Sequence, residues 1–381
     1  MKPLILSIFS VLLLFCLLST NLKSNDNTIN VKWYPSYSAE TVEDVEIGML
    51  WLCSYLGAAV PKGTRQSAIE WKKEHLFSLN FAEVGFSVDR LASVKHIIRN
   101  IKKQPKYKQM GFIDVGELIM LMFNNSAHYY EVTGMPKTIN EFVVKYDFKD
   151  EPMVFEKGES GIAYGARVVF FPKNTDTMLS TAFLAIEGKG SFRDGTFDTL
   201  EFEVFDFMDN GQPRFGIYNK NGKLIPSTDP KLSRAGKPAK CMWCHESTLS
   251  KNFLRNKDFQ EKIETFNSII DPLQEKLFHE QLYKETEVEF DCASDHRRME
   301  FFYFAIEEPT AERLSMEWKV DIEEVKQMVE SLYPHTSHHM PEMGEIYYRS
   351  EVDSLGTSAH LYKGYNMWDE DDEPINYFKE N

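Results

Sequence analysis

Hydrophobic residues in the first third of the chain recur at the spacing of helices. Apolar residues return every three or four positions from Thr41 to Ala59 and again from Val88 to Lys103, which is the period of one helical face. A third helix is expected from Val115 to Asn124. The pattern therefore predicts that residues 25–150 form a mainly helical domain.

The pattern changes after residue 150, where apolar and polar residues alternate. Alternation with a period of two is typical of strands. In one of these segments Glu201 and Glu203 fall on the face opposite to Phe202. Residues 151–230 are therefore expected to form an antiparallel sheet domain with Asn-Gly turns. The expected strands are Ala166 to Phe171, Thr181 to Glu187, Thr199 to Phe207 and Arg214 to Asn219.

Helical spacing returns in the last third of the chain. Apolar residues from Phe259 to Ile270 form one stripe, and those from Leu314 to Leu332 form another. Before them, a loop with three prolines and Gly236 leads from the sheet to Cys241. Residues 231–381 are expected to be a loop followed by a helical region. Together the three regions predict the α+β fold class.

The first 24 residues have the composition of an export signal. Lys2 precedes an apolar stretch from Leu4 to Leu18, and a polar segment follows, which is the order of regions in a secretory signal peptide. The stretch is short for a membrane-spanning helix, which needs about 20 apolar residues. We expect a periplasmic or otherwise exported protein, with membrane association only if the signal stays uncleaved.

The charge of the chain excludes one class of partner. The net charge is -15 over 381 residues, and such an acidic protein is repelled by phosphate backbones. We therefore expect no general nucleic-acid binding.

The stretch with the most chemical information is Cys241-Met242-Trp243-Cys244-His245. In a C-x-x-C-H pentapeptide, two thiols can add to the two vinyl groups of a haem while the adjacent imidazole approaches the iron. These five residues resemble the attachment motif of c-type cytochromes. The resemblance implies one covalent haem c, thioether links at Cys241 and Cys244, and His245 as an iron ligand, all on a haem-attachment loop.

The resemblance implies an exported mono-haem c-type cytochrome-like protein that transfers electrons to or from a redox partner protein. The second axial position of the iron decides between a carrier and an enzyme. An open position would give a peroxidase- or oxidase-type haem enzyme as the alternative function. His128 is one candidate for that position. A loop near the C-terminus offers others, namely His335, His338, His339, Met340 and Met343.

A zinc site is the other interpretation of the same cysteines. Cys241 and Cys244 could join Cys292 and His296 in a tetrahedral site, which would describe a zinc-stabilised exported binding protein without redox activity. If haem takes two thiols instead, Cys53 and Cys292 are either free and buried or paired with each other. A small buried side chain is the expectation for Cys53.

Basic residues gather around the motif although the whole chain is acidic. They could pair with haem propionates or steer an anionic redox partner, or they could simply belong to a solvated loop. Trp243 is expected to pack against the haem edge or the sheet. The basic residues are Lys231, Arg234, Lys237, Lys240, Lys251, Arg255 and Lys257.

Overall fold

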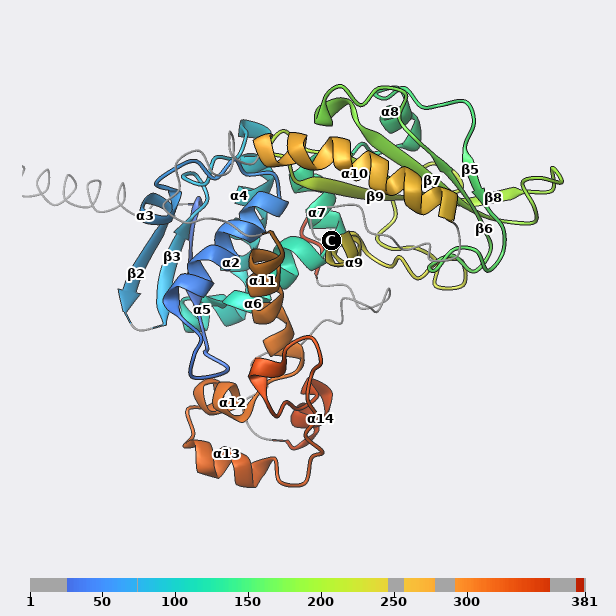
Figure 1. Ribbon diagram of the computed structural model, residues 1–381. Helices are drawn as coiled ribbons and strands as arrows, with labels where there is room; N and C mark the ends of the chain where they lie inside the picture. Colours follow the sequence, from blue (N-terminus) through green and yellow to red (C-terminus); the bar gives the residue numbers. More distant parts are fainter. Residues whose placement is uncertain (1–25, 74, 246–256, 278–291, 357–374, 380–381) are drawn as a thin grey trace, which may run out of the picture.

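The structure is a computed structural model that describes residues 26–73, 75–245, 257–277, 292–356 and 375–379. Helices and two separate sheets make it an α+β protein (Figure 1), which confirms the fold class expected from the sequence. Within these residues, no helix is both long enough and apolar enough to cross a membrane.

The N-terminal region contains the predicted helices. Helix α2 begins at a capping box formed by Thr41 and Asp44, and α4 has the predicted bounds. The third predicted helix is divided, because α6 is followed by the π-helical turn η1. The helices of this region are α2 (Val42–Tyr55), α3 (Thr64–Ala68), α4 (Val88–Lys103), α5 (Pro105–Met110), α6 (Val115–Ile119), η1 (Met120–Asn124), α7 (Ser126–Thr133) and α8 (Ile139–Val143).

The same region also contains a sheet that the sequence pattern did not predict. Its strand order is β2-β3-β1-β4, and β1 pairs antiparallel with β3 and parallel with β4. No strand of this sheet exceeds five residues, so each gives only a weak alternation signal. The strands are β1 (Thr28–Lys32), β2 (Ile69–Lys73), β3 (Leu76–Asn80) and β4 (Ile113–Asp114).

The second sheet confirms the predicted strands and adds a short one at its edge. All neighbouring strands are antiparallel, in the order β5-β6-β7-β8-β9. Gly211 and Gly222, at the predicted turns, have φ angles of 91° and 73°, which favour glycine. The strands are β5 (Met153–Phe155), β6 (Ala166–Phe170), β7 (Ala182–Lys189), β8 (Asp198–Phe207) and β9 (Pro213–Asn219), with the 3-10 turn η2 (Met178–Ser180) before β7.

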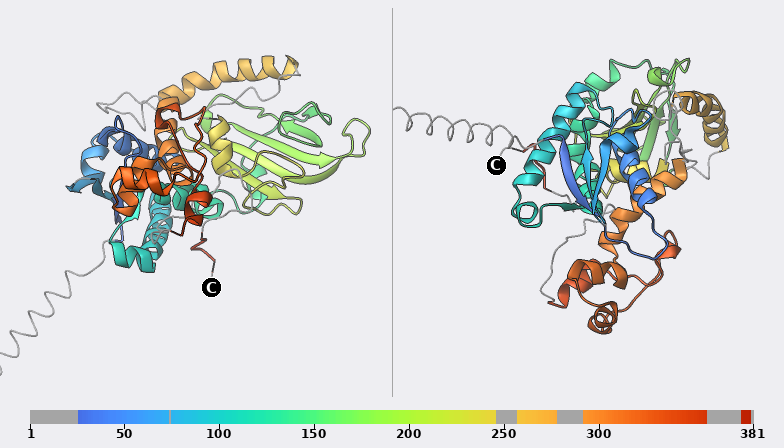
Figure 2. Two further views of the ribbon diagram at one scale, coloured as in Figure 1. Left: turned by 90° about the horizontal axis from the view of Figure 1, so that it is seen from below. Right: turned by 90° about the vertical axis from the view of Figure 1, so that its left-hand side faces the viewer.

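Both faces of the second sheet are covered. Residues of α7 and α8 pack on one face, and Figures 1 and 2 show α10 (Lys257–Leu277) running along the other. The predicted alternation of β8 is present, yet Glu201 and Glu203 do not face solvent, because their face lies under α9 (Pro238–His245) and α10.

The C-terminal helices belong to two packing units. Helix α11 (Cys292–Glu307) packs against α2 and α6 of the N-terminal region. A small lobe built from α12 (Ala311–Trp318), α13 (Ile322–Met328) and α14 (Arg349–Ser354) has its own hydrophobic cluster and projects from the rest (Figure 1). The short 3-10 turn η4 (Pro341–Met343) lies just before α14.

One main core joins the three regions expected from the sequence. It includes Trp51 from α2, Phe205 from β8 and Phe302 from α11. The N-terminal helices, the second sheet and α11 are therefore held together by a continuous apolar interior. The motif of interest lies at the point where these parts meet.

Candidate functional site

The cysteine motif lies on a short helix, which corrects the expected loop. Helix α9 spans Pro238–His245. Proline is tolerated in a first helical turn because its missing N–H has no partner there, and Cys241 N already donates to Lys237 O at 3.1 Å. Residues three and four apart share one face of a helix. Cys241, Cys244 and His245 therefore point to the same side of α9.

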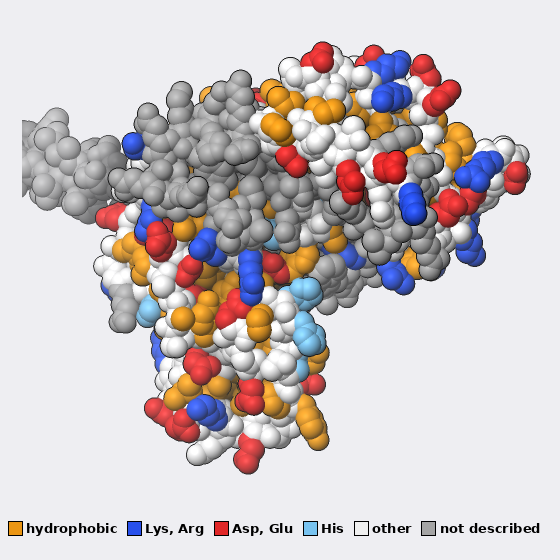
Figure 3. All heavy atoms as spheres, viewed as in Figure 1, with side chains coloured by type: hydrophobic (Ala, Val, Ile, Leu, Met, Phe, Trp, Pro, Cys, Tyr) orange, Lys and Arg blue, Asp and Glu red, His pale blue; other side chains and the backbone are white. Residues whose placement is uncertain are grey.

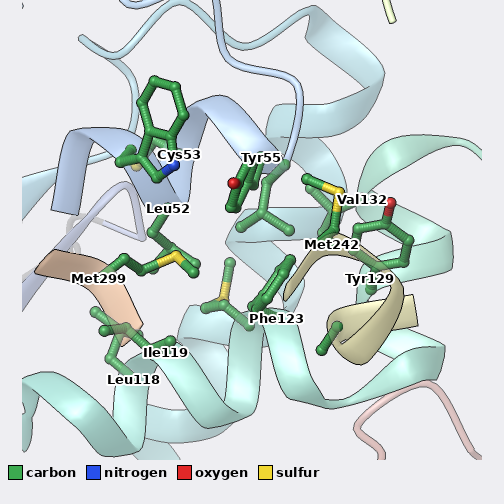
Figure 4. Packing of buried hydrophobic residues seen from close by; sticks show 14 of the residues in the cluster. Leu52, Cys53, Tyr55, Leu118, Ile119, Phe123, Tyr129, Val132, Met242 and Met299 are labelled. Atoms are coloured by element: carbon green, nitrogen blue, oxygen red, sulfur yellow. The ribbon is translucent and has the colours of Figure 1, made fainter. Parts of the chain in front are cut away.

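Met242 fixes this helix to the core. Its side chain is fully buried, and Figure 4 shows it among Tyr129 and Val132 of α7 and Phe123 of η1. Helix α9 also contacts β9. The backbone of the motif is therefore held by packing in which the cysteines take no part.

A cavity lies between α9, α10 and the second sheet, and all three chemically informative residues line it. The empty space inside it is about 970 Å³, a figure that includes the open mouth. The wall is mostly apolar. Its lining from α9 and α10 is Lys240, Cys241, Cys244, His245 and Ile263, and from the sheet Arg167, Val169, Phe171, Phe183, Ala185, Glu203, Val204, Phe205, Phe215, Gly216 and Ile217.

The end of the cavity beside His245 is aromatic. The imidazole ring centre lies 5.2 Å from that of Phe215 and 5.9 Å from that of Phe205. Phe171 and Phe183 continue this surface and pack edge to face at 5.6 Å. Flat aromatic and aliphatic surfaces of this kind suit a large planar ligand.

The other end of the cavity is charged, although the sequence pattern gave no sign of it. Arg167 forms ion pairs with Glu187 and Glu203, and Glu187 lies directly opposite Glu201 in the strand register. Arg167, Glu187 and Glu201 are each at most 6% exposed. The Oε2 atom of Glu201 accepts a hydrogen bond of 2.9 Å from Asp229 N.

Burial raises the proton affinity of the ionisable side chains at this end of the cavity. Desolvation, with a smaller contribution from the negative charge of Glu203, raises the pKa of Glu187 to about 8 and that of Glu201 to about 8. Burial and the Glu203 carboxylate also raise the pKa of the Cys241 thiol. Glu203 and the motif are therefore close enough to interact electrostatically.

Two of the predicted basic residues reach the cavity. Arg234 lines it while its guanidinium lies over the Tyr164 ring at 5.0 Å, and Lys240 lines it from α9. Gly236 has a φ of 68°, and a Cβ atom there would lie 2.7 Å from Lys240 Cδ, so glycine leaves room for that side chain. Of the remaining five, Lys237 is buried, Lys231 and Lys257 are exposed, and Lys251 and Arg255 lie outside the described residues.

The C-terminal residues predicted as candidates for the second axial position of the iron lie outside the described cavity wall. His335 Nε2 lies 2.7 Å from a Glu308 carboxylate oxygen. Met340 and Met343 are buried in the main core, and His338 and His339 are exposed. Figure 3 shows histidines gathered on the side of the α12–α14 lobe. None of these five side chains is among the described residues that line the cavity.

His128 is a structural histidine. Its Nδ1 lies 2.6 Å from Leu121 O, and its Nε2 accepts from Tyr377 N at 2.8 Å. Burial lowers its pKa to about 4, so the ring is neutral at neutral pH. Both ring nitrogens have backbone partners, and the side chain does not enter the described part of the cavity wall.

Trp243 turns away from the sheet, which corrects one of its two expected positions. Its ring packs edge to face on His296 at 5.7 Å. His296 in turn is 1% exposed, and its Nδ1 lies 2.7 Å from Tyr55 Oη. The other expected position of Trp243, at a haem edge, stays a prediction.

The zinc interpretation has only part of its ligand set within the described residues. The side chain of Cys292 lies outside them, and His296 is not among the lining residues of the cavity. In the part of the chain that the structure describes, no three His, Cys, Asp or Glu side chains are grouped as metal ligands. Cys53 and Cys241 are free thiols, and Cys53 is buried as expected.

The donors and walls of the cavity fit a covalent haem. Cys241 and Cys244 could hold it, and His245 could ligate its iron, because all three lie on one helix face and line one space. Arg234 and Lys240 offer cations for carboxylate groups. The aromatic end offers flat apolar contacts.

Comparison of the chain with protein-family models, with curated proteins and with solved structures found no match. The geometry of the cavity therefore carries the functional argument by itself.

Proposed function

We propose that the chain is an exported mono-haem c-type cytochrome-like protein that transfers electrons through a haem attached at Cys241 and Cys244. A redox partner protein would supply or remove the electron. His245 would be the iron ligand on the α9 side.

One observation carries this proposal. Cys241, Cys244 and His245 line a single cavity of mainly apolar character, on a helix fixed by buried Met242. A C-x-x-C-H match by chance has no reason to place both thiols and the imidazole in the wall of one mainly apolar cavity. Burial of a haem in apolar surroundings is also one of the means by which proteins set its potential.

When bound, haem supplies a one-electron couple between ferrous and ferric iron. The residues of the chain have separate tasks around it. The two thiols anchor it, Met242 holds the anchoring helix, and the aromatic wall excludes water. Arg234 and Lys240 supply positive charge at the site, where they pair with propionates or steer an acidic partner.

The test is production in a host that matures c-type cytochromes, followed by a pyridine haemochrome spectrum of denatured protein. We expect one covalent haem per chain in the wild type. In Cys241→Ser and in Cys244→Ser the amount of covalently bound haem should fall by at least about nine tenths. Cys53→Ala, which removes a free thiol outside the cavity, is the control and should keep the haem. Colourless wild-type protein would contradict the proposal, and bound zinc would favour the alternative.

A second candidate function is a haem enzyme of peroxidase or oxidase type. The observation that favours it is the pair Arg167 and Glu203 in the sheet wall of the cavity, since ionisable groups near a haem can move protons for a bound small molecule. Spectral shifts on adding cyanide to ferric protein and carbon monoxide to ferrous protein would favour the enzyme. Spectra unchanged by either ligand would favour the carrier.

A further inference from the structure

The charged end of the cavity is not balanced. Among the residues that the structure describes, Arg167 pairs with Glu187 and Glu203, and Glu201 accepts a hydrogen bond from Asp229 N but has no ion pair. Buried carboxylates are ordinarily paired with cations or neutralised by a proton. With three carboxyl groups and one guanidinium, neutrality requires two protons.

The positions of these groups increase the electrostatic repulsion between the carboxylates. Glu187 and Glu201 are direct cross-strand partners on β7 and β8, and like charges in this arrangement repel. Within the described residues, neither carboxylate oxygen of Glu187 has a hydrogen-bond partner, nor has Oε1 of Glu201 or of Glu203. The Glu187 carboxylate does lie 3.0 Å from Arg167 Nε as an ion pair.

The other buried ion pairs show that such imbalance is unusual in this protein. Asp206 is matched by Arg214 through hydrogen bonds. Farther away, Asp114 and Glu317 are matched by Arg313 and Arg349. Both of these networks hold equal numbers of acids and guanidinium groups.

The unbalanced group is also the one that adjoins the proposed haem. Glu203 and Arg167 line the cavity together with Cys241 and His245. Glu201 is two residues from Glu203 on the same face of β8, and Glu187 lies directly opposite both Glu201 and Arg167. A change of charge in the cavity is therefore felt by the carboxyl groups through a desolvated interior, where charges interact more strongly than in water.

We infer that Glu187, Glu201 and Glu203 form a proton-storing cluster that takes up a proton from solvent when the haem in the adjacent cavity is reduced. The inference rests on the proposed function. One electron from a donor enters the iron, and one proton adds to a carboxylate oxygen, so that the charge added to the cavity is compensated. Oxidation returns the electron to an acceptor and the proton to water.

The surrounding charges set the range in which this exchange occurs. Arg167 from β6 favours the ionised form of Glu187, whereas Glu203 and Asp229 oppose ionisation of Glu201. Arg234 from the loop before α9 and Lys240 from α9 are the other cations that line the cavity. Asn219, the β9 neighbour of Glu201, is uncharged. Since burial raises the pKa of Glu187 and of Glu201 to about 8, proton exchange near neutral pH is feasible.

The experiment is a potentiometric titration of the holoprotein with redox mediators and dithionite from about pH 5.5 to about pH 9, which brackets the raised pKa of about 8. We expect the midpoint potential to fall as pH rises. The double variant Glu187→Gln with Glu201→Gln should lose at least half of that slope. Asp198→Asn, an exposed carboxylate on the same strand, should keep it.

A second measurement uses the wild-type protein, so its result does not depend on whether the double variant folds. Infrared difference spectra of wild-type protein, reduced minus oxidised, should show a carboxylic-acid C=O band that shifts in heavy water. A red protein whose potential is independent of pH, or whose slope survives the double substitution, would overturn the proton-storing role alone. A chain that binds no haem would overturn the proposed function and this inference with it.

Discussion

The two faces of strand β8 bury carboxylates in opposite ways. On the face toward α7 and α8, Asp206 accepts from Arg214 Nε at 2.8 Å and from Tyr146 Oη. Arg214 also donates to Thr133 O and Gly134 O, each at 2.9 Å. On the face toward the cavity, Arg167 pairs with Glu187 and Glu203, and Glu201 lies opposite Glu187 without an ion pair in the described structure.

The difference teaches that burial alone does not assign a role to a charged group. The Asp206 pair is satisfied in full and ties the sheet to the carbonyl end of α7, so its role is structural. The glutamate cluster retains carboxylate oxygens without hydrogen-bond partners in the described structure. Burial also raises the pKa of Glu187 and Glu201, and groups with strongly shifted pKa values beside a cavity are candidates for chemistry.

The largest expected effect comes from breaking the satisfied pair. Arg214→Met leaves the Asp206 carboxylate buried without its guanidinium and frees two carbonyl groups of the α7 end. We expect a loss of about 3–5 kcal/mol in the free energy of unfolding, measured by urea denaturation at pH 7. A loss below about 1 kcal/mol would show that this face is not held by the pair.

A smaller, pH-dependent effect is expected on the cavity face. Arg167→Met removes the cation of the glutamate cluster, and the glutamates can respond by binding protons. The loss of unfolding free energy should be about 2 kcal/mol at pH 8 and less at pH 5, where Glu187 and Glu201 are already protonated. Equal losses at both pH values would contradict the distinction between the faces.

The smallest effect, and the most specific one, concerns how the free energy of unfolding changes with pH. The pKa of Glu187 is raised in the folded protein, so the folded state binds more protons than the unfolded state between about pH 4.5 and pH 8. Its contribution to stability is therefore present below about pH 4.5 and is lost as pH rises toward 8. A tenfold difference in proton affinity between the folded and unfolded states corresponds to about 1.4 kcal/mol.

Glu187→Gln tests that sign. The variant should lose less stability than the wild type as pH rises, and at pH 8 it should be at least as stable, by urea denaturation at each pH. Asp198→Asn is the matched surface control and should stay within about 0.5 kcal/mol of the wild type. The account would be contradicted if the stability of Glu187→Gln, measured relative to wild type, were lower at pH 8 than at pH 5.

Regular elements with a long pattern were predictable from the sequence. Helix α4 has the predicted bounds, and strands β6 to β9 lie within one or two residues of theirs. These segments carry a strong period or end at Asn-Gly turns. The first sheet was missed because its strands are short and β1 pairs with strands more than 40 residues away.

The site was predictable only in part. The thiols and His245 were visible as a motif, but their place on a helix was not, because Pro238 and Gly236 resemble loop residues. The glutamate cluster was missed for a different reason. Alternation in β8 shows that Glu201 and Glu203 share a face, but α9 and α10, which follow later in the chain, decide that this face is buried. The nearby Arg167 could have served as a signal only with the strand pairing known.

The most direct test of the central claim is mass spectrometry of the tryptic peptide from Cys241 to Lys251, which follows from cleavage after Lys240 and Lys251. The protein should be purified from a host that matures c-type cytochromes and alkylated under denaturing conditions before digestion. The account predicts a peptide that carries the mass of one haem and no alkyl group. A peptide of unmodified backbone mass with both thiols alkylated would contradict it.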